Sequence, residues 1–287
     1  MSLFARVLLV LVCPVFAQTP SPPKFPAKSA QTVYLTKPLP ISVDTVGPNF
    51  KGHDIVSIVG ELKRSPMGVP KSEFETTSHY DERIKTLLES RSRQYYFVLD
   101  EFAATAVYNA DDKVMSIKVL ANAVSTLFDN DIHMVNDPTG DSPYFSSGFA
   151  VRSILRSTGH YLATNSFGVK VNVARSTFDE YGVVIDKGDS LFADVKPCCD
   201  HIGTREALLA LEMDVQTAKA LKPFLRVALV CTLVNPTIYE GTGGSSPTIS
   251  YPREIEIRQH YLLVHPDELW AYDRRSGYIL GKFVPGG

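Results

Sequence analysis

The chain of 287 residues has no long apolar run beyond its N-terminus, no excess of either charge and no internal repeat. Without an apolar run of about 20 residues, no later segment can cross a bilayer as a helix. The 29 basic and 31 acidic residues give a net charge of −2, which argues against nucleic acid as a partner because such proteins carry a basic stripe. The sequence also lacks a polybasic patch for a membrane surface. The absence of a repeat excludes solenoids and propellers.

The N-terminus has the pattern of a secretory signal peptide. Arg6 supplies a positive charge, residues 7–13 form a short apolar run, and Ala17 ends a segment of the kind that signal peptidases cleave. A membrane anchor is the alternative, but the apolar run is too short to span a bilayer. We therefore expect residues 1–17 to be removed and the protein to be exported to the periplasm or the extracellular space.

The remaining chain divides by composition. Residues 18–47 are predicted to be an extended linker, because this segment begins with a proline-rich stretch that lacks apolar periodicity. Residues 48–285 are predicted to form one β-rich globular body. A polar loop leaves open a division of this body into two lobes, 48–128 and 149–285.

Two segments have helical patterns. The longer helix is predicted at about 71–90, where Ser72 and Glu75 have the spacing of a capping box, and we expect it to cover a sheet face. A shorter helix is predicted at about 215–222, with Asp214 as its N-cap. The buried stripe of the longer helix is expected to comprise Tyr80, Ile84, Leu87 and Leu88.

Strand patterns account for most of the rest. Apolar or alternating segments predict strands at 54–62, 94–100, 106–120 (two strands around a turn), 167–174, 181–186, 205–214, 224–234, 254–264 and 268–283 (a hairpin that turns at 273–277). The segment 181–186 is expected to pair back on 167–174, and 237–252 is interpreted as a flexible excursion. Together these elements predict an α+β fold, predominantly antiparallel β, with a sandwich-like sheet or sheets.

Two segments resemble a pattern found in uncharacterised exported bacterial proteins. The first is a K-x-E-F-E-T-T-x-x-Y-x-x-R segment that begins at Lys71 and ends at Arg83, and the second is an N-x-F-G-V-x-V-x-V segment at 165–173. The run at 218–236 is also similar to the later part of such chains. The resemblance implies an exported bacterial protein and assigns no activity, cofactor or catalytic residue.

The segment VKPCCDHIG, residues 195–203, contains the most reactive group of side chains. Cys198, Cys199, Asp200 and His201 are adjacent, whereas structural zinc sites use pairs of ligands that are spaced by two to four residues and come from two parts of the chain. Adjacent residues on a strand also point to opposite faces. A catalytic Cys–His pair is not indicated by adjacency either. We therefore predict no metal-binding, cofactor-binding or catalytic residue here.

A disulfide is the favoured role for this segment. Cys231 lies on a strand, and a bond to Cys199, or alternatively to Cys198, would close a loop of about 33 residues. Such a bond stabilises a protein by roughly 3–4 kcal/mol in the chain-entropy model, and export makes it possible. A bond between Cys198 and Cys199 is disfavoured because their α-carbons are too close. Three buried thiols are the remaining alternative.

An acidic segment, a glycine-rich segment and a set of aromatic residues are three further candidates for binding sites. The acidic segment 128–141 lacks the glycine and glutamate of an EF-hand, so a solvated loop is expected. The glycines of 241–247 have no lysine and no following helix, so a phosphate cradle is not indicated. A set of aromatic residues could line a binding face, although sheet packing is the more common role; they are Tyr95, Tyr96, Tyr144, Phe145, Tyr239 and Tyr251.

No catalytic signature emerges from the sequence. We therefore predict a non-catalytic exported protein, either a binding module or an envelope-associated one, with a protein or cell-envelope partner. The alternative is an exported hydrolase whose catalytic groups meet only in the fold. A cavity that gathers histidine and carboxylate groups would favour the hydrolase, whereas an exposed sheet surface without such a cavity would favour binding.

Overall fold

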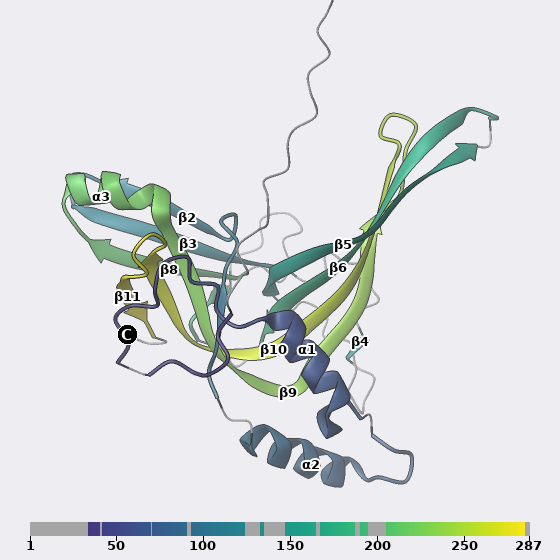
Figure 1. The fold of residues 1–287 in the computed structure, drawn as a ribbon, viewed down its shortest axis with the longest axis horizontal. Coiled ribbons are helices and arrows are strands. Elements are labelled where there is room, and N and C mark those ends of the chain that lie inside the picture. Colours follow the sequence, from purple (N-terminus) through teal and green to yellow (C-terminus); the bar gives the residue numbers. More distant parts are fainter. Residues whose placement is uncertain are drawn as a thin grey trace, which may run out of the picture. The chain divides into compact units, whose positions relative to one another are not determined.

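Four long strands organise the computed structural model of the protein (Figure 1). They are β5 (Ser147–Thr164), β6 (Lys170–Ile185), β9 (Leu225–Ser245) and β10 (Arg253–Asp273). β5 and β6 form one antiparallel hairpin, β9 and β10 form another, and β6 and β10 pair in parallel. The two hairpins therefore make a continuous sheet in the order β5-β6-β10-β9.

The structure describes residues 34–40, 42–69, 71–90, 93–123, 133–134, 147–164, 167–186, 190–194 and 205–284, all within a unit that runs from Val33 to Gly287. The expected signal peptide and the segment from 195 to 203 lie outside these residues.

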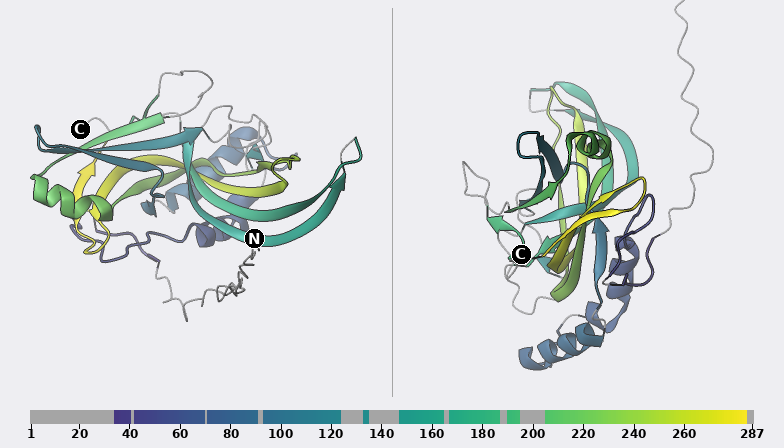
Figure 2. Two further views of the ribbon diagram at one scale, coloured as in Figure 1. Left: turned by 90° about the horizontal axis from the view of Figure 1, so that it is seen from above. Right: turned by 90° about the vertical axis from the view of Figure 1, so that its left-hand side faces the viewer.

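Seven shorter strands extend the sheet in both directions (Figure 2). They are β1 (Tyr95–Val98), β2 (Ala104–Asn109), β3 (Val114–Ala123), β4 (His133–Met134), β7 (Ala193–Asp194), β8 (Arg205–Glu212) and β11 (Ile279–Phe283). The main path runs β1-β9-β10-β6-β5-β3-β8-β7, with β11 on β10, β2 on β3 and β4 on β9. Among the pairings between these strands in the described residues, every one except β6–β10 is antiparallel. The predicted α+β fold with predominantly antiparallel strands is confirmed.

The helices are fewer and shorter than the strands. The α-helices are α1 (Ile55–Arg64), α2 (Thr77–Ser90) and α3 (Val215–Leu221), and short 3-10 helices are η1 (Pro66–Gly68) and η2 (Lys222–Phe224). Over the described residues, every helix falls short of the length and apolar character needed to traverse a bilayer. The predicted short helix is confirmed, since the Asp214 side chain accepts hydrogen bonds from Gln216 and Thr217 at the start of α3.

The strand predicted at 54–62 is wrong, because this segment forms α1. The Asp54 carboxylate accepts a hydrogen bond from the Val56 backbone N–H at 3.3 Å and so caps the helix. The four buried residues are Ile55, Ile58, Val59 and Leu62, which recur at helical spacing. α1 packs with this stripe against β6 and β10. It therefore covers a face of the sheet, a role that the sequence predicts for the longer helix.

The longer helix begins later than predicted. α2 starts at Thr77, and the Thr76 hydroxyl accepts from the His79 backbone N–H at 3.2 Å, so Ser72 and Glu75 do not form a capping box. They close a turn instead, with the Glu75 N–H donating to the Ser72 carbonyl at 3.0 Å. The expected stripe is confirmed at Tyr80 and Ile84, which are fully buried.

Two predictions about the long strands are wrong. The segments 167–174 and 181–186 do not pair with each other, because residues 170–174 and 181–185 belong to the same strand, β6. The expected flexible excursion is also largely a strand, because β9 continues to Ser245 and pairs with β10 along that length. Only the turn near 246–252 remains outside a strand.

The hydrophobic core covers both faces of one part of the long strands. Val227, Leu229 and Cys231 of β9 belong to the large cluster on the α1 side, whereas Ala228 and Val230 contact Phe50, Trp270 and Tyr272 on the other side. Residues 35–46 pack on this second cluster through Leu35, Leu39, Val43 and Val46. We call residues 227–231 of β9 and 269–272 of β10 the covered half of the strands.

Candidate functional site

Parts of all four long strands extend beyond this core and form what we call the ribbon: the described residues of 153–178 in β5 and β6 and of 241–258 in β9 and β10 (Figure 1). Most β5 residues in the ribbon are exposed on both faces of the sheet. The outer side of β5 pairs with β3 only at Gly148 and Ser147 among the described residues. The ribbon therefore presents a long strand edge of unpaired backbone groups within this described part.

One face of the ribbon carries an apolar row across its strands. Leu155 of β5 pairs with Phe178 of β6, which pairs with Ile257 of β10, which in turn faces Gly243 of β9. Directly opposed residues share a sheet face, so these side chains form one row. Leu155 is 54% exposed, Phe178 and Ile257 are half-buried, and Gly243 adds no side chain over them.

The end of the ribbon carries larger exposed apolar residues, which we call the tip residues. They are Leu162, Phe167, Val169, Ile249 and Tyr251. Phe167 is 89% exposed and Leu162 is 64% exposed. The tip residues come from the ends of two hairpins at the same end of the sheet, and exposed apolar side chains that share one region of a surface are typical of interaction sites.

A charged cluster lies where the ribbon meets α1. Lys63 of α1 forms an ion pair with Glu240 of β9, and His260 Nδ1 of β10 lies 2.7 Å from the same Glu240 oxygen and 3.2 Å from Lys63 Nζ. The His260 ring also stacks on Tyr181 of β6, with centroids 4.9 Å apart. Hydrogen bonds with His260 and then Lys63 lower the pKa of Glu240 to about 2. The cluster ties the helix to two strands, and its carboxylate stays ionised.

A cavity of about 150 Å³ lies between β2, β3 and the start of β9. Its floor is apolar, and its rim carries Asp100, Glu101, Lys222 and Arg226. Glu101 and Arg226 already pair with each other at 3.3 Å. The volume is below the roughly 300–1,000 Å³ of typical ligand pockets, and the lining contains no histidine. The cavity therefore has carboxylates on its rim but not the histidine that a hydrolase of the predicted kind would combine with them.

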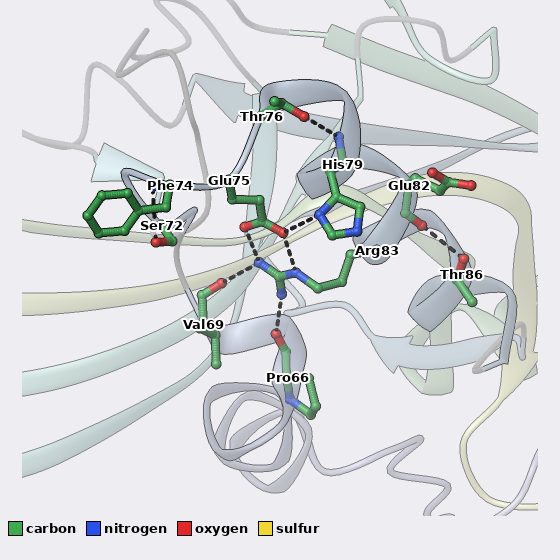
Figure 3. A network of polar contacts seen from close by, with 10 residues as sticks. All are labelled: Pro66, Val69, Ser72, Phe74, Glu75, Thr76, His79, Glu82, Arg83 and Thr86. Atoms are coloured by element: carbon green, nitrogen blue, oxygen red, sulfur yellow. Dashed lines mark hydrogen bonds and ion pairs between the residues drawn. The ribbon is translucent and has the colours of Figure 1, made fainter.

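The segment 71–83, on which the resemblance to exported proteins rests, takes part in a network of polar contacts (Figure 3). Arg83 binds both oxygens of Glu75, at 3.0 and 3.1 Å, and donates to the Pro66 carbonyl at 2.9 Å. The hydrogen bonds from Arg83 lower the pKa of Glu75. These contacts fasten the start of α2 to η1, so Glu75 and Arg83 serve the fold. Phe74 of the same segment is 91% exposed and takes no part.

The cysteine predicted to form a disulfide is fully buried. The Cys231 thiol lies 3.8 Å from the Tyr95 carbonyl oxygen, and it is a free thiol in this structure. Burial raises the pKa of the Cys231 thiol well above its usual value. Cys198 and Cys199 lie outside the described residues, so the disulfide remains a prediction.

The other groups weighed from the sequence are dispersed. Within the acidic segment 128–141 only His133 and Met134 are described, where β4 pairs with β9 opposite Glu240 and Tyr239. Over the described residues, no three histidine, cysteine or carboxylate side chains are grouped so that they could hold a metal ion. Among the aromatic candidates, Tyr95, Tyr96 and Tyr239 are buried and Tyr251 is exposed; the other two are not described.

Sequence reasoning missed most of the ribbon surface. The alternation in 167–174 was interpreted as a half-buried strand, but Phe167 and Val169 are exposed and only Val173 is fully buried. The sequence patterns do not identify β5 (Ser147–Thr164). One signal was available: residues 142–178 contain no aspartate or glutamate, which is unusual in a chain of balanced charge.

No protein-family model, no curated protein and no solved structure matches this chain.

Proposed function

We propose that this chain is a non-catalytic exported protein that attaches to the cell envelope through its ribbon. The observation that carries the proposal is the continuation of four strands past the hydrophobic core, with apolar side chains exposed on a face and at the tip. Exposed apolar surface on a regular scaffold is typical of interaction sites. The pattern of residues 1–17 supports export.

The hydrolase alternative receives less support. The cavity on β2 and β3 has no histidine. Histidine–carboxylate pairs such as His265–Asp186 and His260–Glu240 lie outside that cavity, and Lys63, Glu240 and His260 hold α1 against two strands. A structural role at the base of the ribbon accounts for them.

Fractionation of the cells that export the protein tests this proposal. The wild-type chain should sediment with envelope membranes, and the double variant Leu155→Ser/Leu162→Ser should shift to the soluble exported fraction. Leu208→Ser is the matched control, because Leu208 is 72% exposed on β8, outside the ribbon. A wild-type chain that stays soluble, or a ribbon variant that sediments like wild type, would contradict the proposal.

A further inference from the structure

We propose that the tip of the ribbon inserts into the surface of a bilayer that contains anionic lipid. This inference rests on the proposed function and names the partner of the same surface. Three properties of the tip lead to it: the position of its two loops, the way its apolar side chains protrude, and its charge.

The loops of the two hairpins lie at the same end of the ribbon. β6 and β10 are parallel, with Ala174 opposite Arg253, and the Ala174 N–H donates to the Pro252 carbonyl at 3.0 Å. Each of these strands begins directly after its hairpin loop. The two loops, far apart in sequence, therefore lie at the same end of the sheet, where the β5–β6 hairpin reaches beyond the β9–β10 hairpin (Figures 1 and 2).

The apolar side chains at this end protrude and do not line a groove. Phe167, Val169, Ile249 and Tyr251 all lie in or beside the loops and are between 46% and 89% exposed. A protein partner would have to supply a shaped recess for each of them. The apolar interior of a bilayer accepts such side chains without any matching shape, and aromatic residues are favoured at its interface.

The charge of the tip matches an anionic surface. Residues 157–178 and 241–253 contain Lys170, Arg175 and Arg253 and no aspartate or glutamate. Lys170 and Arg253 are exposed, and the Arg253 guanidinium lies 5.5 Å from the centre of the exposed Tyr251 ring. Arg175 is already paired with Glu256 at 2.7 Å and lies 3.6 Å from Glu254, so Lys170 and Arg253 are the cations that this end offers to an anionic surface.

This arrangement of apolar tips flanked by cations is the pattern of interfacial membrane binding. No polybasic patch is visible in the sequence because these cations are distributed between two hairpins, and only the fold brings them to one end. Lys170 and Arg253 would contact lipid phosphates while the tip residues enter the acyl boundary.

Vesicle co-sedimentation of the chain purified from the exported fraction tests the inference. We expect binding to phosphatidylcholine vesicles that contain phosphatidylglycerol, and at least ten-fold weaker binding to phosphatidylcholine alone. The variant Phe167→Ser/Val169→Ser should bind the anionic vesicles at least ten-fold more weakly than wild type. Phe102→Ser should bind like wild type, because Phe102 is also 89% exposed but lies in the turn between β1 and β2.

A fluorescence measurement provides a second readout that does not depend on sedimentation. Phe167→Trp should give a blue-shifted emission when anionic vesicles are added, and Phe102→Trp should not. The native Trp270 is only 3% exposed and supplies a constant background. The tip side chains contribute little to the core, so the variants are expected to fold, and circular dichroism checks this.

The outcomes separate the two proposals. If the wild-type chain does not bind anionic vesicles, or if the Phe167→Ser/Val169→Ser variant binds them as well as wild type does, the proposed lipid binding is wrong. In that case ribbon-dependent sedimentation with envelope membranes would still support the proposed function and would indicate a protein partner. If sedimentation with the envelope is also independent of the ribbon, both proposals fail.

Discussion

The covered half and the ribbon are two parts of the same strands, and they differ in what surrounds them. In the covered half, consecutive residues such as Ala228, Leu229 and Val230 are fully buried because core clusters lie on both faces. In the ribbon, Leu155 and Leu162 of β5 are more than half exposed. Strand pairing continues from one part to the other, with register shifts in β10 at Leu262/Val264 and Pro266/Glu268 and in β5 at Ala150/Arg152 and Leu155/Ser157. Pairing alone therefore maintains the strands, while side-chain burial, which supplies most of the stability, is confined to one end.

This difference indicates distinct roles. A strand that stabilises the fold needs apolar side chains against a core, as in the covered half. The ribbon has few such contacts, so its length contributes little to folding, and its exposed surface is available for the proposed attachment. Mutations in the two parts should accordingly separate stability from binding.

The largest effect is expected in the covered half. Leu229→Ala removes a fully buried side chain and should lower the free energy of unfolding by about 2–5 kcal/mol, because the cavity cannot refill completely. Urea denaturation followed by circular dichroism measures this. Leu208→Ala, at a 72% exposed position, is the control and should change stability by less than about 0.5 kcal/mol. Equal effects at the two positions would contradict the assignment of the core.

The boundary between the two parts should be sensitive to small increases in volume. A Cβ at Gly182 would lie 2.2 Å from the Tyr261 ring and 2.4 Å from the Phe149 carbonyl oxygen. Gly182→Ala should therefore destabilise the protein by about 1–3 kcal/mol through overpacking, as measured by thermal unfolding. Gly159→Ala in the ribbon meets no atom within 4 Å and should be nearly neutral. If Gly182→Ala left the stability unchanged, both the Tyr261 ring and the Phe149 carbonyl would have to shift without cost.

The charged cluster at the base of the ribbon should make stability depend on acid. The pKa of Glu240 is about 2 in the fold, against an ordinary value of 4.5, so the folded state binds fewer protons between these values. The contribution of Glu240 is then present above about pH 4.5 and is lost as the pH falls toward 2. Because Glu240 is 35% exposed, we expect only about 1 kcal/mol.

Glu240→Gln tests this contribution. The variant should be less stable than wild type at pH 7, and the difference should disappear near pH 2, as measured by urea denaturation at each pH. Glu61→Gln, on an exposed position of α1, should show no such dependence on pH. A difference that persists unchanged at low pH would exclude the ionic contribution.

The smallest effect on stability is expected in the ribbon. Leu162→Ser should change the free energy of unfolding by less than about 0.5 kcal/mol, since the side chain is 64% exposed. The same variant should nevertheless weaken envelope association. A large loss of stability would show that the ribbon face is part of the core, and the distinction between the two halves would have to be abandoned.

Local signals in the sequence predicted some elements well. Asp214 before an alanine- and lysine-containing turn identified α3, and the segment Asp273–Gly277 identified the β10–β11 hairpin, in which Gly277 has a φ of +73°. Both depend on interactions within a few residues. The stripe of Ile55, Ile58, Val59 and Leu62 in α1 is equally local, but a short apolar run of this length fits a buried strand as well as a helix.

The ribbon could not be predicted in the same way. Alternation in 167–174 identifies a strand but does not say whether a core covers either face, because that depends on distant elements such as α1. The glycines of 241–245 resemble a loop, yet Gly244 pairs with Glu256, and a Cβ there would lie 1.9 Å from the Ile255 carbonyl oxygen. The close contact explains why glycine is needed in a strand, and only the paired neighbour reveals it.

The burial of Cys231 has a consequence for the dynamics of the protein. Its Sγ lies beneath the pairing of β9 with β1, where Cys231 faces Tyr95. A thiol reagent can reach it only when these strands separate, and the raised pKa keeps it protonated and unreactive until then. The labelling rate of this thiol under native conditions should therefore follow the opening free energy of the central sheet, while remaining insensitive to fraying of the ribbon.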